Sequence, residues 1–402
     1  MNSRTCNAGG PGTGRAIAFW AVLAAAATCA APRASADDAA ACAEVSYLKE
    51  VAIPACTRLI QSGNLHGVDL ARAYSYRGRA RLWASNPNDF DPAMADHDEA
   101  VRLAPDLSSV YVNRALGWVR LGKREPAGED VEKAIALDPG NAQAYFTRAE
   151  MNRYAPERRE QVIADYGKAI AIQPDYIDAY FAQATMLSDR DFERAIDAYG
   201  RIIALTPDWQ DGAAYQARAA AYAAAGDDRL ALADRTEVIR LKPGRGAYVD
   251  RGFVYLRLLD YDHAAADFQA ALQSGEHPGA HTGLAAVYRA RGDFDRALAE
   301  VNAAMRVAPG LAGLLVERAS TYLAMGKTAE ALADIDASLR PFPRDPGAHL
   351  VKARIYEAMG RKDDAIAEFR QVRDLLTSAR TAYDRRTLAD SLDGLDRLGR
   401  TP

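Results

Sequence analysis

The sequence lacks the residue patterns that mark the common catalytic sites. This chain of 402 residues contains no P-loop, no nucleophile elbow around a serine and no Gly-x-Gly-x-x-Gly turn. Carboxylates are abundant, but we expect them on solvated helix faces. The formal net charge is −4 and no block of basic residues is present. These absences argue against an enzyme and against a nucleic-acid partner.

Histidine is also scarce, with 6 residues in the chain. His277 and His281 lie four positions apart, a spacing that would let two side chains of one helix share a metal ion. Pro278 and Gly279 between them favour a turn instead, and no carboxylate–histidine pattern of a zinc protease occurs. We therefore predict no metal site and no cofactor.

Long apolar runs are missing except at the N-terminus. Arg4 and Arg15 precede the apolar stretch 16–31, and Ala34-Ser35-Ala36 has the small residues of a cleavage site. The pattern predicts that residues 1–36 form a secretory signal peptide. No later segment is long and apolar enough to cross a membrane.

Two other interpretations of this leader remain open. The apolar stretch could be retained as a membrane anchor, although it is shorter than the about 20 residues that a span needs. Cys29 could carry a lipid, although Thr28 before it is larger than lipoprotein processing usually accepts.

Cysteine is rare, and only Cys42 and Cys56 would survive cleavage of the leader. An even number of cysteines in an exported chain favours a disulfide. Unbroken helix would separate the two Cα atoms by about 21 Å, whereas a disulfide needs them within about 7 Å. We expect Cys42 on a segment that folds back onto a helix holding Cys56. The alternative is two unpaired buried thiols. Residues 37–68 are interpreted as an N-terminal capping half-repeat.

A repeat with a period of about 34 residues fills most of the chain. In the second copy Tyr111, Ala115 and Trp118 recur at the spacing of one helical face, followed by a second helix around Ala127 and Ala134. Proline then ends the second helix of most copies. The pattern predicts an all-α fold with nine helical hairpins in residues 69–375 and a C-terminal capping helix in 376–402.

Oppositely charged residues recur together in six copies. The pairs are Arg77 and Asp96, Arg114 and Asp130, Arg148 and Asp165, Arg218 and Asp234, Arg251 and Asp267, and Arg318 and Asp334. The three copies without this arginine also lack the aspartate, and have Gln183 with Ala198, Leu284 with Glu300, and Lys352 with Glu368. A catalytic site would be assembled once. We therefore interpret the pairs as partly buried salt bridges within hairpins rather than as acid–base groups.

The spacing of the small residues resembles the tetratricopeptide repeat family over residues of about 70 to 375. The resemblance rests on a small Gly or Ala, a second Ala 12 residues later, Ala or an equivalent seven later, and then Pro. It implies antiparallel helix pairs stacked in a right-handed superhelix, a solenoid whose concave groove is lined by first helices and holds peptides or proteins. The leader, the Cys42 and Cys56 opening and the Tyr-x-x-Arg-Gly/Ala pattern resemble exported bacterial members. This implies a periplasmic or secreted protein.

The groove positions lie one residue after the repeating aromatic and one after the small residue. They lack the Lys and Asn of the subgroup that binds the acidic C-terminus of a chaperone, and instead combine an apolar floor with polar sides, which suits a peptide. The predicted partner-binding residues are Arg79, Val112, Asn113, Leu116, Phe146, Glu150, Arg153, Phe181 and Phe253. The alternative is that these residues pack against the neighbouring repeat.

The sequence thus predicts a scaffold or adaptor that binds a protein or peptide partner. Two other functions remain open: an enzyme-associated envelope protein with an unrecognised catalytic site, and a self-assembling structural protein. The sequence sets neither the partner nor the oligomeric state.

Overall fold

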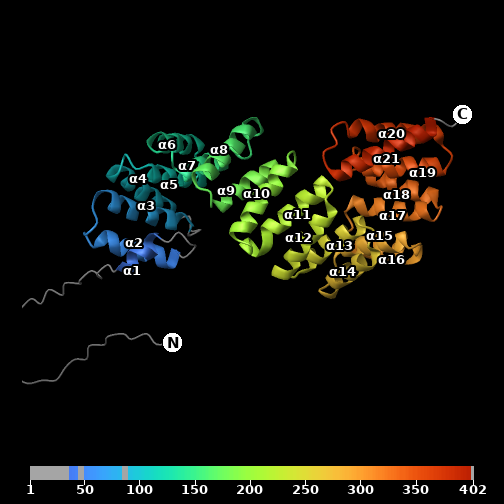
Figure 1. Cartoon of the computed structure of the whole chain (residues 1–402), viewed down its shortest axis with the longest axis horizontal. Coiled ribbons are helices and arrows are strands. Elements are labelled where there is room, and N and C mark those ends of the chain that lie inside the picture. Colours follow the sequence, from blue (N-terminus) through green and yellow to red (C-terminus); the bar gives the residue numbers. More distant parts are fainter. Residues whose placement is uncertain (1–35, 44–48, 84–88, 400–402) are drawn as a thin grey trace, which may run out of the picture. The chain divides into compact units, whose positions relative to one another are not determined.

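The computed structural model describes residues 36–43, 49–83 and 89–399. The described residues form 21 α-helices and no strand, so the all-α prediction is confirmed (Figure 1). The predicted signal sequence, up to Ser35, lies outside the described residues. Within the described part of the chain, no helix has both the length and the apolar character that a membrane crossing needs.

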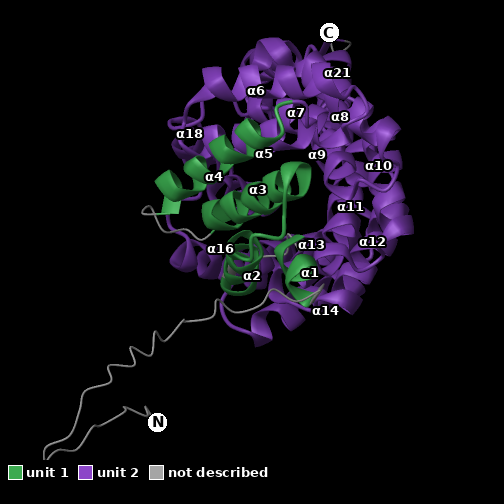
Figure 2. Cartoon of the chain, turned by 90° about the vertical axis from the view of Figure 1, so that its left-hand side faces the viewer, with its two compact units in different colours: residues 1–105 green, residues 106–402 purple. Residues whose placement is uncertain are grey.

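The chain divides into two compact units, residues 1–105 and 106–402, which Figure 2 distinguishes by colour. The first unit contains four helices: α1 (Ala36–Ala43), α2 (Lys49–Gln61), α3 (Gly67–Trp83) and α4 (Phe90–Leu103). Helix α3 pairs with α4 as the first hairpin of the repeat, and α1 and α2 precede it. The segment predicted as a half-repeat therefore holds two helices rather than one.

A disulfide joins α1 to α2. It links Cys42 to Cys56 with a Cα–Cα distance of 4.8 Å, and both cysteines are buried. The alternative of two unpaired thiols is therefore wrong. Arg58 of α2 reinforces the contact because its Nε donates a hydrogen bond of 3.0 Å to Asp38 of α1.

The second unit is a series of eight helical hairpins followed by α21 (Ala382–Gly399). The hairpins are α5 (Ser108–Arg120) with α6 (Arg124–Leu137), α7 (Ala142–Asn152) with α8 (Arg159–Ile172), α9 (Ile177–Leu187) with α10 (Phe192–Leu205), α11 (Ala213–Ala225) with α12 (Asp228–Leu241), α13 (Arg245–Arg257) with α14 (Tyr261–Gln273), α15 (Pro278–Ala290) with α16 (Phe294–Val307), α17 (Ala312–Ala324) with α18 (Thr328–Leu339), and α19 (Pro346–Ala358) with α20 (Lys362–Leu375). The two helices of each hairpin pack against each other, and the second helix of each hairpin packs against the first helix that follows it.

Small residues let the helices approach closely where they cross. Gly252 of α13 and Gly283 of α15 lie on either side of the buried Phe268 ring of α14. A Cβ added at Gly252 would come within 2.7 Å of that ring. The small position of the repeat is therefore required by packing between helices.

Most turns between the two helices of a hairpin contain glycine with a positive φ. Gly226 ends α11 in this way, with φ 107°, as expected for a left-handed residue that closes the last turn. In the turn after α13 the same place is taken by Leu259, whose φ is 60°. A leucine in this region is strained, since its Cβ crowds the backbone.

Candidate partner-binding surface

The arginine and aspartate of each charged pair bind each other between the two helices of one hairpin. Arg114 of α5 donates from Nε and Nη2 to the two carboxylate oxygens of Asp130 of α6, at 2.8 and 2.7 Å. The same two-bond geometry joins Arg148 to Asp165 and Arg251 to Asp267. Such parallel bonds between guanidinium and carboxylate are strong and directional.

All six predicted pairs have this arrangement, the other three being Arg77 with Asp96, Arg218 with Asp234, and Arg318 with Asp334. In several copies the guanidinium also lies over the tyrosine three residues earlier, as Arg77 does over Tyr74 at 5.3 Å. The pairs connect the two helices of a hairpin, so their charges are not offered to a substrate or a partner.

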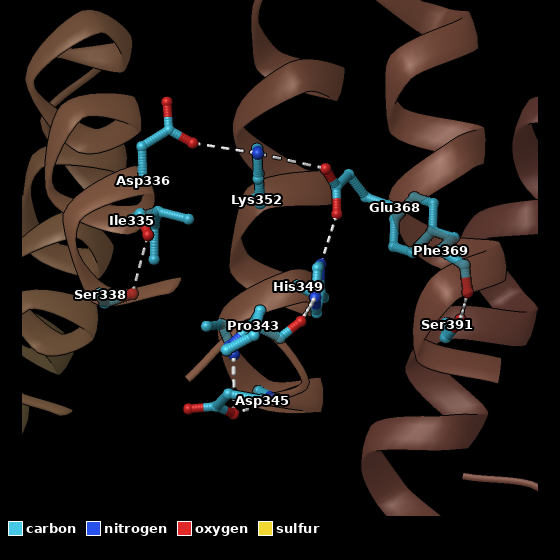
Figure 3. Close-up of polar contacts among 12 residues, drawn as sticks. Ile335, Asp336, Ser338, Pro343, Asp345, His349, Lys352, Glu368, Phe369 and Ser391 are labelled. Atoms are coloured by element: carbon cyan, nitrogen blue, oxygen red, sulfur yellow. Dashed lines mark hydrogen bonds and ion pairs between the residues drawn. The ribbon is translucent and has the colours of Figure 1, made fainter. Parts of the chain in front are cut away.

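The hairpins without the pair are held by other contacts. In α9–α10, Gln183 of α9 instead donates from its side-chain amide to the carbonyl of Ile163 in α8 of the preceding hairpin, at 3.0 Å, so this contact joins two hairpins. Glu300 of α16 contacts the ring of His281, and Glu368 of α20 contacts His349 and Lys352. Figure 3 shows Glu368 between these two side chains of α19.

These two histidines were not predicted from the sequence as partners of the glutamates. Each stands where other first helices have tyrosine, four residues before the small position. That substitution was the available signal, because it occurs in two copies where the Arg–Asp pair is absent.

Two of the predicted groove residues are buried. Val112 is 1% exposed and Asn113 is 6% exposed. Neither side chain offers a surface to a partner, so their assignment to the groove is wrong. Helix α5, which carries both residues, packs against α6 of its own hairpin and against α7 of the next one, and both side chains are buried.

The predicted aromatic floor is packed within hairpins and between them. The Phe146 ring lies 5.8 Å from that of Tyr166 and 5.0 Å from that of Tyr176. The Phe181 ring lies 4.8 Å from that of Trp209, and Phe253 meets Phe268 edge to face at 5.1 Å. These rings are partly buried and belong to the core between repeats, which is the alternative named above.

The predicted polar residues of α7 form a small network. Arg153 forms an ion pair of 3.1 Å with Glu150, and the Tyr166 hydroxyl donates a short hydrogen bond to the same glutamate. Burial, together with the neighbouring Glu150, raises the pKa of Tyr166 well above its ordinary value. Tyr166 therefore stays a neutral donor that fixes Glu150 in place. Arg79 belongs to α3 of the first unit and is half-buried.

Two exposed side chains lie close in the sequence to predicted partner-binding residues. Val119 follows Leu116 by three residues on α5 and is 39% exposed, and Tyr154 directly follows Arg153 and is 82% exposed. Helices α5 and α7 are in contact. We call this set the α5–α7 surface, and its members are Leu116, Val119, Glu150, Arg153 and Tyr154. The sequence contained a signal for both residues, because Val119 lies one helical turn after Leu116 and Tyr154 directly follows Arg153.

One open pocket lies away from the α5–α7 surface. An open pocket of about 380 Å³ lies at the turn between α15 and α16, lined by residues 291–295 and Met325. Its arginine, Arg291, is already paired with Asp262. Among the described residues, no cluster of three or more His, Cys, Asp or Glu side chains is arranged to hold a metal ion.

Comparison with known families assigns the repeat. Three models described as tetratricopeptide repeat match residues 249–312, 284–356 and 346–373. The chain therefore contains tetratricopeptide repeats in this region. The hairpins α5 to α12 share the same small residues and proline positions, and all of them except α9–α10 have the Arg–Asp contact.

Curated relatives match over short segments only. The human mitochondrial import receptor subunit TOM70 is 28% identical over 102 residues, which is 24% of this chain and 16% of the relative. Human sperm-associated antigen 1 is 30% identical over 64 residues, which is 16% of this chain and 7% of the relative. The chain thus spans less than a fifth of the length of either relative.

Solved structures are similar over more of the chain, at lower identity. Yeast Tom70 has a TM-score of 0.46 and 16% identity, with 87% of this chain and 92% of that one covered. A tetratricopeptide repeat protein from Parabacteroides merdae has a TM-score of 0.40 and 18% identity, with 71% and 98% covered.

Proposed function

We propose that this chain is an exported scaffold or adaptor that binds a protein or peptide partner through exposed side chains of its first helices. The tetratricopeptide repeats in residues 249–373 support an interaction role, because stacked hairpins provide extended binding surfaces. The commitment of the recurrent charges to intra-hairpin pairs supports a role without catalysis.

The observation that carries the proposal is the composition of the α5–α7 surface. Tyr154 is almost fully exposed, and Arg153 lies beneath its ring at 5.2 Å. Tyrosine and arginine are enriched among the residues that dominate binding energy at protein interfaces. Val119 adds an apolar contact, and the Glu150–Arg153 pair supplies charges at a fixed position.

Binding by this surface is tested with the purified protein as bait for envelope extracts, with chemical crosslinking and mass spectrometry to identify what binds. We expect the double substitution Val119→Ser with Tyr154→Ala to lower capture of the specific partner at least about tenfold, as loss of a dominant residue would. The matched control is Leu230→Ser on the second helix α12, which is similarly exposed. Unchanged capture by the double variant, with partner crosslinks outside α5 and α7, would place binding elsewhere.

Export is proposed from the leader and from the disulfide. The small residues at 34–36 suit a signal peptidase, and the Cys42–Cys56 bond suits an oxidising compartment such as the periplasm. Cell fractionation and N-terminal sequencing test this directly. A mature chain that begins at Asp37 in the periplasmic fraction is the expected result. A full-length chain in the membrane pellet would favour the anchor instead.

Self-assembly is the second candidate, because exposed first-helix faces can also bind another copy of the chain. Light scattering over a wide concentration range distinguishes the two. A constant monomer mass supports the adaptor, whereas a mass that grows with concentration supports the structural protein.

A further inference from the structure

Two hairpins replace the arginine–aspartate pair with a histidine–glutamate pair. In the hairpin α15–α16, Nδ1 of His281 lies 2.6 Å from Glu300 of α16. In the hairpin α19–α20, Nδ1 of His349 lies 2.6 Å from Glu368 of α20 (Figure 3). In both cases the carboxylate has the place of the aspartate and the ring has the place of the repeating tyrosine.

The second nitrogen of each ring also meets an acceptor. Nε2 of His281 lies 2.5 Å from the carboxylate of Glu276, in the segment before α15. Nε2 of His349 lies 3.0 Å from the backbone carbonyl of Pro343. A neutral imidazole has one N–H and one lone pair, whereas an imidazolium has two N–H donors. Two acceptors around one ring are therefore satisfied together by the charged form.

We propose that the hairpins α15–α16 and α19–α20 are closed by proton-dependent latches, in which the imidazolium of His281 or His349 ties the first helix to the glutamate of the second. Loss of the proton leaves one ring nitrogen with its lone pair facing an acceptor. The latch then loses one charge-assisted hydrogen bond and its ion pair. The guanidinium of the other hairpins keeps its protons throughout the range in which histidine titrates.

Taken together, the charged groups around His281 favour its protonated form. Glu300 from α16 and Glu276 from the preceding segment face the ring, whereas burial, Arg245 and His281 lower the pKa of the neighbouring His277. Helix α13 directs Arg245 and Asp250 at His277 rather than at His281. Burial opposes the charge on His281, but the two glutamates outweigh it and raise the pKa of His281 above its ordinary value.

The surroundings of His349 act in the same direction. The hydrogen bond to Glu368 raises the pKa of His349 above its ordinary value, against burial and the charge of Lys352. Lys352 itself bridges Glu368 at 3.3 Å and Asp336 of α18 at 3.0 Å. Burial alone would raise the pKa of Glu368, but the bond from His349 and the nearby positive charges lower it.

The sign of the pH dependence follows from these directions. A histidine whose pKa is raised by folding stabilises the fold fully below its ordinary pKa of about 6.5. That contribution is lost as the pH rises through the folded pKa. Glu368, whose pKa is lowered, keeps its contribution until the pH falls through its own lowered value. The latches are therefore closed in mildly acidic solution, below the ordinary pKa of histidine, and open as the pH rises through the raised pKa of the folded state.

Hydrogen exchange of the full chain, followed by mass spectrometry at about pH 6 and about pH 9, tests the latches. After correction for the intrinsic exchange rate, we expect the opening equilibrium of α15–α16 and α19–α20 to increase about tenfold, the effect of losing one charge-assisted bond. The hairpin α11–α12, which is closed by Arg218 and Asp234 and contains no histidine, is the control within the same molecule. Equal pH dependence in all three hairpins would overturn the proposal.

Variants sharpen the result. The triple substitution His349→Tyr, Lys352→Arg and Glu368→Asp gives α19–α20 the residues of the other hairpins, and we expect retained protection without the pH dependence. The double substitution His281→Gln with His349→Gln should remove the pH dependence of exchange in both hairpins. The matched control His66→Gln, at an exposed histidine of the first unit, should leave this pH dependence unchanged. A pH dependence that persists in the double glutamine variant would contradict the role of the rings.

Discussion

Arg251 of α13 and Asp267 of α14 form two hydrogen bonds of 2.8 Å each, and the carboxylate is almost fully buried. Removal of the arginine would leave a buried carboxylate without its charge partner. We expect Arg251→Ala and Asp267→Ala each to lower the free energy of unfolding by about 2 to 3 kcal/mol. The guanidinium is more exposed than the carboxylate, which keeps these values below those of a fully buried pair.

A double-mutant cycle in urea denaturation measures the coupling between the two side chains. We expect a coupling energy above about 1 kcal/mol, because the double variant leaves no unpaired charge. The control pair is Arg240 and Glu237 on the surface of α12, whose coupling should stay below about 0.5 kcal/mol. A coupling no larger than that of the control would show that the buried pair is not a structural tie.

Leu259 is predicted to reduce stability at the turn after α13. Leu259 has a φ of 60° and lies at the turn position that Gly292, with a φ of 77°, has in the next hairpin. The side chain of Leu259 is 69% exposed. Substitution Leu259→Gly removes the clash between Cβ and the backbone and sacrifices little packing. We expect it to raise the free energy of unfolding by about 1 kcal/mol. Gly292→Leu is the reverse control and should lower it by a similar amount. A loss of stability in Leu259→Gly would mean that the leucine makes contacts that outweigh its strain.

Gly252 and Gly246 lie on the same helix but in opposite surroundings. A Cβ at Gly252 would collide with the Phe268 ring, whereas a Cβ at Gly246 would meet no atom within 4 Å. We expect Gly252→Ala to lower the free energy of unfolding by about 1 to 3 kcal/mol through overpacking. Gly246→Ala should be neutral or raise it by about 0.5 kcal/mol, because alanine is the better helix former. Thermal or urea denaturation of the two variants measures this difference in stability. Equal effects would argue against a close approach of Gly252 to the Phe268 ring.

The Cys42–Cys56 disulfide is expected to stabilise the first unit. It closes a loop of 14 residues, and loops of this length correspond to about 3 kcal/mol in the chain-entropy account. Substitution Cys42→Ala with Cys56→Ala should therefore increase hydrogen exchange in α1 and α2 and leave α13 to α20 unchanged. A change that extends equally over both units would contradict a local role.

How far the sequence predicts this molecule depends on whether a feature recurs. The Arg114–Asp130 contact could be inferred because both residues appear and disappear together in successive copies. His281 was not recognised as its substitute, since that required knowing that a glutamate in place of the aspartate reaches a ring one turn earlier on the first helix. Leu259 gave no turn signal, because the usual glycine is replaced there.

The candidate site was harder to predict than the fold for a geometric reason. Each first helix has one face toward its own hairpin, another toward the next hairpin and a third toward solvent. Periodicity identifies the apolar positions but does not separate the second face from the third. Val112 and Asn113 fell on the covered face for this reason, whereas Leu116 lies nearer the exposed one.

Phe146 provides a direct test of this distinction. Its ring contacts that of Tyr166 in the second helix α8 of its own hairpin and that of Tyr176 just before the next hairpin, so Phe146→Ala removes core packing and leaves a cavity. We expect a decrease of about 3 to 4 kcal/mol in the free energy of unfolding. Tyr154→Ala on the exposed surface should change it by less than about 0.5 kcal/mol. If both variants fold as stably as the wild type, Phe146 has no packing role and its ring is available to a partner, as the sequence first suggested. If only Phe146→Ala is destabilised, its loss of partner capture has to be attributed to the fold, and Tyr154 becomes the residue that reports on binding.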